Sequence, residues 1–288
     1  MTALPVEAAV VAERGARGLV EIELVGLGPT SRPRLSVVVP AYHERASIAA
    51  NLARLVEALD ATTLSWEVIV VVDGDRETYL AALRDRDPRV QVYGYESNRG
   101  KGFALRFGMS KASGDLVTFI DSDMEISPDE IGRMAALLDL YDADVVVGSK
   151  RHPLSEVQYP WLRRLQSAGY QMLVRLLFRV RVRDTQTGLK MMRREVALRV
   201  LGAALVKRFA FDLELLALAR HFGFRRIIEA PVRITYAFAS TTNLRSVFWV
   251  LLDTLAIFYR LRLRRTYDRG NLGMVALLAA LPAILGAD

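Results

Sequence analysis

Two aspartates one residue apart, Asp121 and Asp123, are the residues of this chain best suited to chemistry. With Ser122 between them, they follow the apolar, β-branched run 116–120, which predicts a buried strand. Carboxylates with this spacing at a strand end can hold one divalent cation, both directly or one of them through water. Such a cation would neutralise a pyrophosphate leaving group. An isolated Asp-x-Asp is more often a solvated turn, so its surroundings decide the interpretation.

Polar groups also follow three other predicted strands. Tyr42 comes after the apolar run 35–39, Asp73 follows 66–72, and a glycine loop at 98–102 follows Val90–Tyr95. An aromatic ring can stack on a base and a carboxylate can accept from a base N–H. Glycine amides beside Lys101 can bind an anion. Taken alone, Tyr42 and Asp73 are better explained as ordinary polar residues at strand ends, and the loop alone is also compatible with a simple turn. The loop has neither the Walker A nor the GxGxxG spacing.

The elements that would position these residues alternate regularly. Helical spacing at 47–59, 78–86, 103–111 and 128–140 separates the strands, and a further strand is expected at 144–147. This alternation predicts βαβ crossovers and a mostly parallel sheet. Ligands of such sheets bind beyond the carboxyl ends of the strands, where the polar groups collect.

Composition narrows the chemistry. There is no cysteine and only three histidines, without metal-ligand spacing, so a metal would be held by carboxylates, which favours Mg²⁺ or Mn²⁺. Lys plus Arg (39) exceed Asp plus Glu (32), which suggests an anionic partner: nucleic acid, a phospholipid surface or a phosphorylated substrate. We expect a cytoplasmic amino terminus without a secretory signal. No apolar run reaches the about 20 residues of a transmembrane helix, although 247–259, broken by Asp253, and 274–286, which contains Pro282, come close.

The second half is basic and apolar. Helices are expected at 161–182, 211–220 and 244–265, a polar loop at 184–190 and a strand at 232–236. Lys190 and Arg151 are candidate phosphate ligands, unless the loop is a solvated connector. Asp212 is either a functional carboxylate or a helix cap, and Glu214 either functional or exposed. Arginines interleaved with apolar residues in 161–182 and 244–265 fit interfacial helices on an anionic membrane, with packing on the core as the alternative.

Seven segments, in order and spacing, resemble the family 2 glycosyltransferases of the GT-A type. The similarity is closest to the polyprenyl-phosphate (dolichyl-phosphate) glucosyl- and mannosyltransferases and covers residues 35 to about 236. It implies an α/β, Rossmann-like GT-A domain over 34–240 with a mostly parallel sheet. An amino-terminal arm (1–33) would precede it, and amphipathic membrane-associating helices (241–288) would follow. The segments are VVVPAYHE (37–44), EVIVVVDGD (67–75), NRGKGFALRFGM (98–109), GDLVTFIDSDME (114–125), GSKR (148–151), DTQTGLKMMRRE (184–195) and FAFDLELL (209–216).

The resemblance also implies roles for single residues. A nucleotide-sugar site would consist of Pro40, Tyr42 and Glu44 near the nucleobase and ribose, Asp73 on the base, Gly100 and Lys101 in the nucleotide loop, and Asp121, Ser122 and Asp123 on the diphosphate. Asp121 and Asp123 would hold Mg²⁺ or Mn²⁺, with Glu125 as a third ligand. Arg151, Gln186 and Lys190 would line the sugar and acceptor-phosphate side, and Asp212 would lie near the sugar.

The sequence departs from its relatives at two positions. Val72 stands where relatives carry a first aspartate, and Ser240 is followed by Thr241 rather than lysine, with Arg245 as a substitute cation.

The expected reaction is inverting transfer of a sugar to a polyprenyl phosphate by a peripheral or monotopic enzyme on the cytoplasmic face of the cell membrane. The segments DTQTGLK and FAFDLELL favour glucose from UDP-glucose. The alternatives are a GDP-mannose-dependent mannosyltransferase, and a family 2 transferase with a soluble saccharide acceptor, which would need Asp212 or Glu214 as a base. A nucleotide- or nucleic-acid-binding module is disfavoured because the arginines accompany apolar runs, so we expect no nucleic acid partner.

Overall fold

A seven-stranded sheet forms the centre of the molecule, in the order β5-β4-β3-β6-β8-β7-β9. The structure, a computed structural model, describes residues 10–14, 20–24, 32–84, 86–155, 161–206, 210–234, 244–264 and 266–267. The strands are β3 (Leu35–Ala41), β4 (Trp66–Asp73), β5 (Val90–Tyr95), β6 (Leu116–Phe119), β7 (Val145–Ser149), β8 (Lys190–Arg193) and β9 (Ile227–Pro231). A separate antiparallel pair, β1 (Val10–Arg14) and β2 (Val20–Leu24), precedes them.

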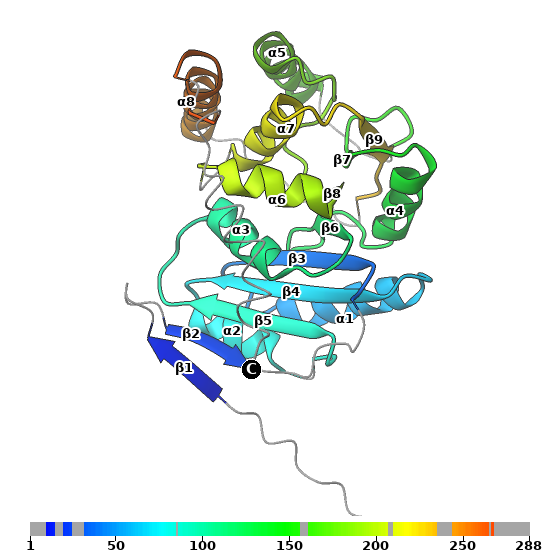
Figure 1. Ribbon diagram of the computed structural model, residues 1–288, viewed down its shortest axis with the longest axis vertical. Helices are drawn as coiled ribbons and strands as arrows, with labels where there is room; N and C mark the ends of the chain where they lie inside the picture. The colour runs from blue at the N-terminus through cyan, green and yellow to red at the C-terminus, as the bar shows by residue number, and fades with distance from the viewer. Residues whose placement is uncertain are drawn as a thin grey trace, which may run out of the picture.

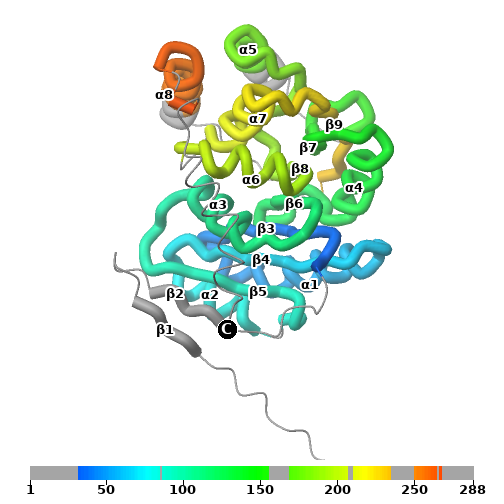
Figure 2. Tube along the Cα trace, in the orientation of Figure 1, coloured from blue at the N-terminus to red at the C-terminus, as the bar shows by residue number. Residues whose placement is uncertain are grey.

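The sheet is mostly parallel, as predicted. β3, β4, β5 and β6 are parallel, as are β7 and β9, whereas β8 runs antiparallel between β6 and β7. The chain moves from β3 out to β5 and then returns to β6 on the other side of β3, as the colour ramp of Figure 2 shows. The winding direction therefore reverses between β3 and β6. In open α/β sheets this switch point is where the carboxyl ends leave a crevice for a ligand.

Helices cover both faces of the sheet. Alternate residues of each strand point to opposite faces, so Val38 packs with one helix layer while Val37 and Val39 pack with the other. The layer on the Val37 side consists of α1 (Ile48–Asp60), α2 (Arg76–Ala82) and α4 (Glu130–Leu140). The opposite layer consists of α3 (Lys101–Lys111), α6 (Arg194–Ala203) and α7 (Phe211–His221).

Two further helices lie beyond α7 at one end of the molecule (Figure 1). They are α5 (Trp161–Phe178) and α8 (Leu244–Phe258), and α8 continues into one π-helical turn, η1 (Tyr259–Leu263). Val174 and Phe178 of α5 and Ile257 of α8 join the hydrophobic core on the α3 side. No helix in the described part of the chain combines the length and apolarity needed to cross a bilayer.

The predicted elements are confirmed through β7, with ends shifted by a few residues, but the later strands differ. The sequence predicted a strand at 232–236. The strand is β9, five residues earlier, and only an isolated bridge joins Ile126 to Ile234, so that prediction was wrong over 232–234. Residues 235 and 236 lie outside the described residues. Lys190, expected in a polar loop, opens β8, whose first three residues are all buried and therefore show no alternation.

Of the predicted segments, the amino-terminal arm and the region 241–288 are described only in part. Ser240 and Thr241 lie outside the described residues, as does the side chain of Arg245.

Helix α3 approaches the sheet closely enough to require glycine at position 108. A Cβ at Gly108 would lie 2.4 Å from Val38 Cγ1 and 2.9 Å from Val71 Cγ2. Because these are buried side chains of central strands, α3 and its amino-terminal Lys101 can keep their position only if this contact stays free of a side chain.

We expect Gly108→Ala to lower the free energy of unfolding by about 1–3 kcal/mol through overpacking. Gly169→Ala is the matched control, since nothing lies within 4 Å of a Cβ built there. The control is expected to stabilise α5 by roughly 0.5–1 kcal/mol, because alanine replaces glycine within a helix. Urea unfolding followed by circular dichroism measures both. Equal effects at the two positions would contradict the packing argument.

Candidate active site

A crevice at the carboxyl end of β6, next to the β3/β6 switch point, is lined by carboxylates. Asp121 and Asp123 follow β6, and Asn51 of α1 donates from Nδ2 to the Ser122 carbonyl at 2.9 Å, which fixes the loop against the neighbouring crossover. A small cavity of about 10 Å³ opens here, roughly the volume of one water. Its lining consists of Ile120, Asp121, Asp123, Glu125, Ile126, Lys150 and Gly188.

Negative charge converges on Asp123. Partial desolvation raises the pKa of its carboxyl, and the carboxylates of Asp121, Glu125 and Glu44 raise that pKa further. The site thus favours a cation, which would offset the repulsion between these groups.

Two lysines counter this charge. Lys101 Nζ lies 2.5 Å from Asp121 Oδ1, and Lys150 Nζ lies 2.5 Å from Glu125 Oε2. Burial acts to lower the pKa of Lys101, but Asp121 and Asp212 outweigh it, so the pKa is raised and the ammonium stays charged. Lys150 was not among the residues predicted from the sequence. The two adjacent basic residues at 150 and 151, in the segment GSKR, were the sequence signal that could have identified it.

The donor set fits a hard divalent cation held by Asp121 and Asp123. Carboxylate oxygens suit Mg²⁺ or Mn²⁺, and both ions also accept water and phosphate oxygens. Among the described residues, no three His, Asp or Glu side chains converge as a metal-binding group. Glu125, expected as a third ligand, is turned to Lys150 instead.

Asp73 organises the glycine loop. Its carboxylate is buried and accepts from the amides of Arg99, at 2.6 Å, and Gly100, at 2.8 Å. Gly74 has φ +74°, and a Cβ there would lie 2.2 Å from Asn98 N. Asp73 was expected to accept from a base, whereas here it shapes the loop that carries Lys101.

Lys190 and Asp212 form a buried ion pair. Lys190 is fully buried, and its Nζ donates to Asp212 Oδ1 at 2.7 Å and to the Thr187 carbonyl at 2.5 Å. The other oxygen, Asp212 Oδ2, lies 4.0 Å from Lys101 Nζ. The structure therefore places Lys190, expected as a phosphate ligand, inside the protein. It also gives Asp212 two ammonium neighbours, which makes it a weak candidate for a general base.

Glu214 is buried, so the interpretation of an exposed side chain is wrong. Its Oε2 accepts from the Leu205 and Val206 amides, and its Oε1 accepts from the Tyr267 hydroxyl at 2.5 Å. Burial raises the pKa of Glu214, while these hydrogen bonds act to lower it. Asp212 is not a helix cap either, since Ala210 occupies that position.

The segment 184–190, which we call the site loop, closes one wall of the crevice. A Cβ at Gly188 would lie 1.9 Å from Asp121 Oδ2, so only glycine lets the loop approach this carboxylate. Gln186 is exposed, and Arg151 donates to the Arg183 carbonyl at 3.4 Å.

On the β3 side, Pro40 is buried and Tyr42 is 45% exposed, with its ring centroid 3.9 Å from that of His43. Glu44 accepts from the Ser47 hydroxyl. Tyr42 is thus accessible for stacking.

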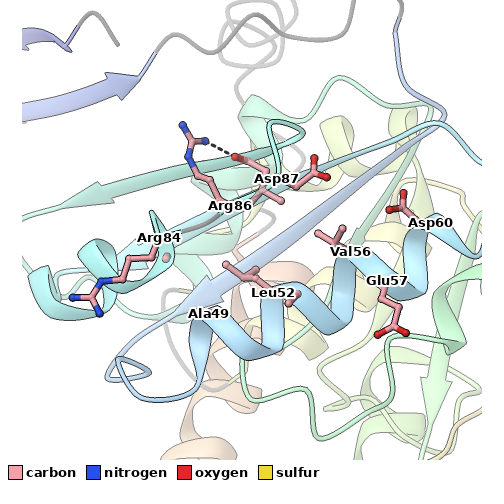
Figure 3. Close-up of a pocket in the computed structure, with 11 residues that line it drawn as sticks. Ala49, Leu52, Val56, Glu57, Asp60, Arg84, Arg86 and Asp87 are labelled. Atoms are coloured by element: carbon pink, nitrogen blue, oxygen red, sulfur yellow. Dashed lines mark hydrogen bonds between the residues drawn. The ribbon is translucent and has the colours of Figure 1, made fainter. Parts of the chain in front are cut away.

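A larger hollow of about 560 Å³ lies along α1, shown in Figure 3. Its floor is apolar, with Leu52 and Val56, and three of its charged residues pair with protein atoms: Arg86 donates to the Val90 carbonyl, and Asp60 and Asp87 accept from Arg89. It extends toward the amino end of β5, away from the strand ends that carry Asp121. We therefore assign the chemistry to the smaller, charged crevice.

Comparison with known proteins identifies the family of the chain and gives the same fold. The family model described as glycosyl transferase family 2 matches residues 36–201. A dolichyl-phosphate beta-glucosyltransferase of Homo sapiens is 29% identical over 247 residues, covering 80% of this chain and 75% of the human protein. The Mus musculus protein of the same name is 30% identical, covering 80% and 75%.

Among solved structures, the chain is similar to glucosyl-3-phosphoglycerate synthase from Mycobacterium tuberculosis in complex with Mn²⁺, UDP and phosphoglyceric acid. The TM-score is 0.57 at 21% identity, with 79% of this chain and 78% of that chain covered. This likeness concerns the fold. The family match spans β3 to α6, including Asp121, Asp123, Lys101 and the site loop, and the chain therefore belongs to glycosyl transferase family 2.

Proposed function

We propose that this glycosyltransferase transfers glucose from UDP-glucose to a polyprenyl phosphate at a lipid surface on the cytoplasmic side of the cell membrane. The observation that carries the proposal is the carboxylate crevice at the β3/β6 switch point, where Asp121 and Asp123 face Lys101 and Lys150. Relatives named dolichyl-phosphate beta-glucosyltransferases, at up to 35% identity, support the sugar and the acceptor class.

In this proposal Asp121 and Asp123 would hold Mg²⁺ or Mn²⁺, which would supply charge stabilisation for a leaving nucleoside diphosphate. Tyr42 stacks on the base, and Lys101 at the amino end of α3 lies on the phosphate side of the crevice. Asp73 acts by holding the loop of Gly100 and Lys101 rather than by contacting the base.

Displacement needs no strong base. An acceptor phosphate oxygen is already anionic, so it attacks the anomeric carbon directly while the bond from that carbon to the diphosphate oxygen breaks and the diphosphate leaves with the electron pair. The configuration inverts. Positioning and electrostatics then supply the rate enhancement. The ion pairing of Asp212 with Lys190 supports this route over a saccharide acceptor, which would require a free carboxylate base.

The lipid surface is proposed from the end of the molecule formed by α5, α8 and η1. Met172 and Leu176 of α5 are 75% and 78% exposed, and Leu255 and Leu263 are 51% and 69% exposed. Exposed arginines flank these residues, among them Arg175, Arg179, Arg262 and Arg264. Apolar side chains ringed by cations suit an anionic interface.

Turnover with a donor panel tests the reaction. UDP-glucose or GDP-mannose is supplied with one short polyprenyl phosphate, and the product is identified by mass and sugar analysis. We expect acceptor-stimulated transfer from UDP-glucose that stops on addition of EDTA. Asp123→Ala should reduce turnover on the order of 100-fold, because it removes charge stabilisation of the leaving group. Transfer to soluble saccharides but not to the lipid, or normal activity of Asp123→Ala, would refute the proposal.

We expect that breaking the buried ion pair lowers the free energy of unfolding, whatever its effect on catalysis. Asp212→Asn leaves the Lys190 ammonium without its countercharge, and we expect the free energy of unfolding to fall by about 3–5 kcal/mol. The double variant Lys190→Met, Asp212→Leu should recover most of that stability, since an apolar pair can replace a buried ion pair. Urea unfolding measures both, and a double variant less stable than Asp212→Asn would contradict the assignment.

Sedimentation with vesicles tests the surface. Wild type should bind vesicles containing phosphatidylglycerol at low salt and release at high salt, because each arginine near an anionic leaflet adds about 1 kcal/mol. The double variant Leu255→Ser, Leu263→Ser should bind several-fold more weakly. Leu140→Ser on α4 is the control, because Leu140 is an exposed leucine (75%) outside this surface, and this variant should bind normally. If Leu140→Ser lost as much vesicle binding as the double variant, the lipid contact would not lie at Leu255 and Leu263.

A further inference from the structure

A chain of side-chain hydrogen bonds links α8 and α5 to the site loop. Thr254 of α8 is fully buried, and its Oγ1 lies 3.0 Å from the Tyr170 hydroxyl of α5. The same Tyr170 hydroxyl accepts from Gln186 Nε2 at 3.4 Å. Three residues from three separate elements thus meet at one phenol oxygen.

The direction of these hydrogen bonds follows from the available protons. The Thr254 hydroxyl donates to the Val250 carbonyl at 2.7 Å, so its oxygen is left as an acceptor. Tyr170 must then donate its only proton to Thr254, and its lone pair accepts from the Gln186 amide. Burial raises the pKa of Tyr170, which keeps the phenol protonated. The chain therefore runs in one direction, from Gln186 through Tyr170 and Thr254 to α8.

The residue that follows Tyr170 in α5 also holds the site loop, at the residue before Gln186. Gln171, which is 6% exposed, donates from Nε2 to Thr185 Oγ1 at 3.4 Å. Among the described residues, the side-chain oxygens Gln171 Oε1 and Thr187 Oγ1 are buried without a hydrogen-bond partner. The ends of the loop are held by other elements, since Lys150 N donates to Asp184 Oδ2 at 3.3 Å and Gly148 N to the Leu189 carbonyl at 3.0 Å, whereas the side chains of Thr185 and Gln186 are held by α5. The loop in turn places Gly188 against Asp121 and Lys190 toward Asp212.

We propose that Tyr170 is a positioning residue through which α8 sets the geometry of the site loop. Tyr170 touches neither substrate nor metal in this proposal, and it acts by holding Gln186. This inference rests on the proposed function in one respect: that the site loop contacts the sugar and the acceptor phosphate. Helix α8, which we propose to contact the lipid surface, is thus also linked through Tyr170 to the site loop. That loop forms the wall of the crevice at which the acceptor phosphate would bind.

Hydrogen exchange on the full-length protein tests the link without any substrate. Thr254→Val keeps the side-chain shape but removes the hydroxyl, Thr254→Ser keeps the hydroxyl, and Tyr170→Phe keeps the ring. We expect deuterium uptake by residues 184–190 to become several-fold faster in Thr254→Val and Tyr170→Phe and to stay at the wild-type rate in Thr254→Ser. Uptake by α1 serves as the internal reference and should be unchanged in all three.

Kinetics supply the second readout. Loss of one hydrogen bond should raise the KM for the polyprenyl phosphate by roughly 2- to 10-fold, with the KM for the nucleotide sugar unchanged. Because the Thr254 link passes through Tyr170, the double variant Tyr170→Phe, Thr254→Val should be no worse than Tyr170→Phe alone.

Three results would overturn the proposal: wild-type exchange of 184–190 in Thr254→Val, equal acceleration in Thr254→Ser, or single-variant effects on exchange that multiply in the double variant. Failure of the proposed function would look different. Wild type would then lack acceptor-dependent turnover, while the exchange comparison would still decide whether Tyr170 holds the loop.

Discussion

Charge balance in the crevice is the constraint on which the rest of the site depends. Asp121, Asp123, Glu125 and Asp212 are brought together with Lys101, Lys150 and Lys190, and every described pairing joins residues far apart in the sequence. Unpaired charges of this kind are costly away from water, and Asp121, Glu125 and Asp212 each lie beside a lysine. The Lys190–Asp212 pair is the buried end of this array, and the Asp121 end is partly exposed.

This arrangement explains why several conspicuous residues act indirectly. Asp73 binds the amides of Arg99 and Gly100, and Lys190 binds Asp212, so both support a neighbour instead of facing solvent. The charged residues that line the cavity are Asp121, Asp123, Glu125 and Lys150. A transferase that uses an anionic nucleophile can work with such a site, because it needs a positioned cation and fixed geometry more than a proton acceptor.

The second half of the chain supplies the walls of the crevice. β8 inserts between β6 and β7 and carries the site loop to Asp121, where Gly188 permits the close approach. Helix α5 contacts that loop through Tyr170 and Gln171, and α8 contacts Tyr170. The exposed side chains described on α5, α8 and η1 include apolar and basic ones, such as Leu176 and Arg262. Helices α5 and α8 therefore form the surface that we propose to contact lipid and also hold the loop that forms one wall of the crevice.

Local patterns along the chain were enough to predict the parallel half of the fold and the polar residues at its strand ends. Buried strands such as 35–39 and 66–72 are continuous apolar runs with polar residues directly after them, and these local patterns also predicted Asp121, Asp123 and Lys101 at one sheet edge. Tertiary structure alone decided β8, β9 and the partners of each charge. KMMR has no period of its own, so only pairing with β6 and β7 makes it a strand. Likewise, whether Lys190 meets a phosphate or Asp212, and whether Glu125 meets a metal or Lys150, depends on side chains brought together by folding, which spacing along the chain does not encode.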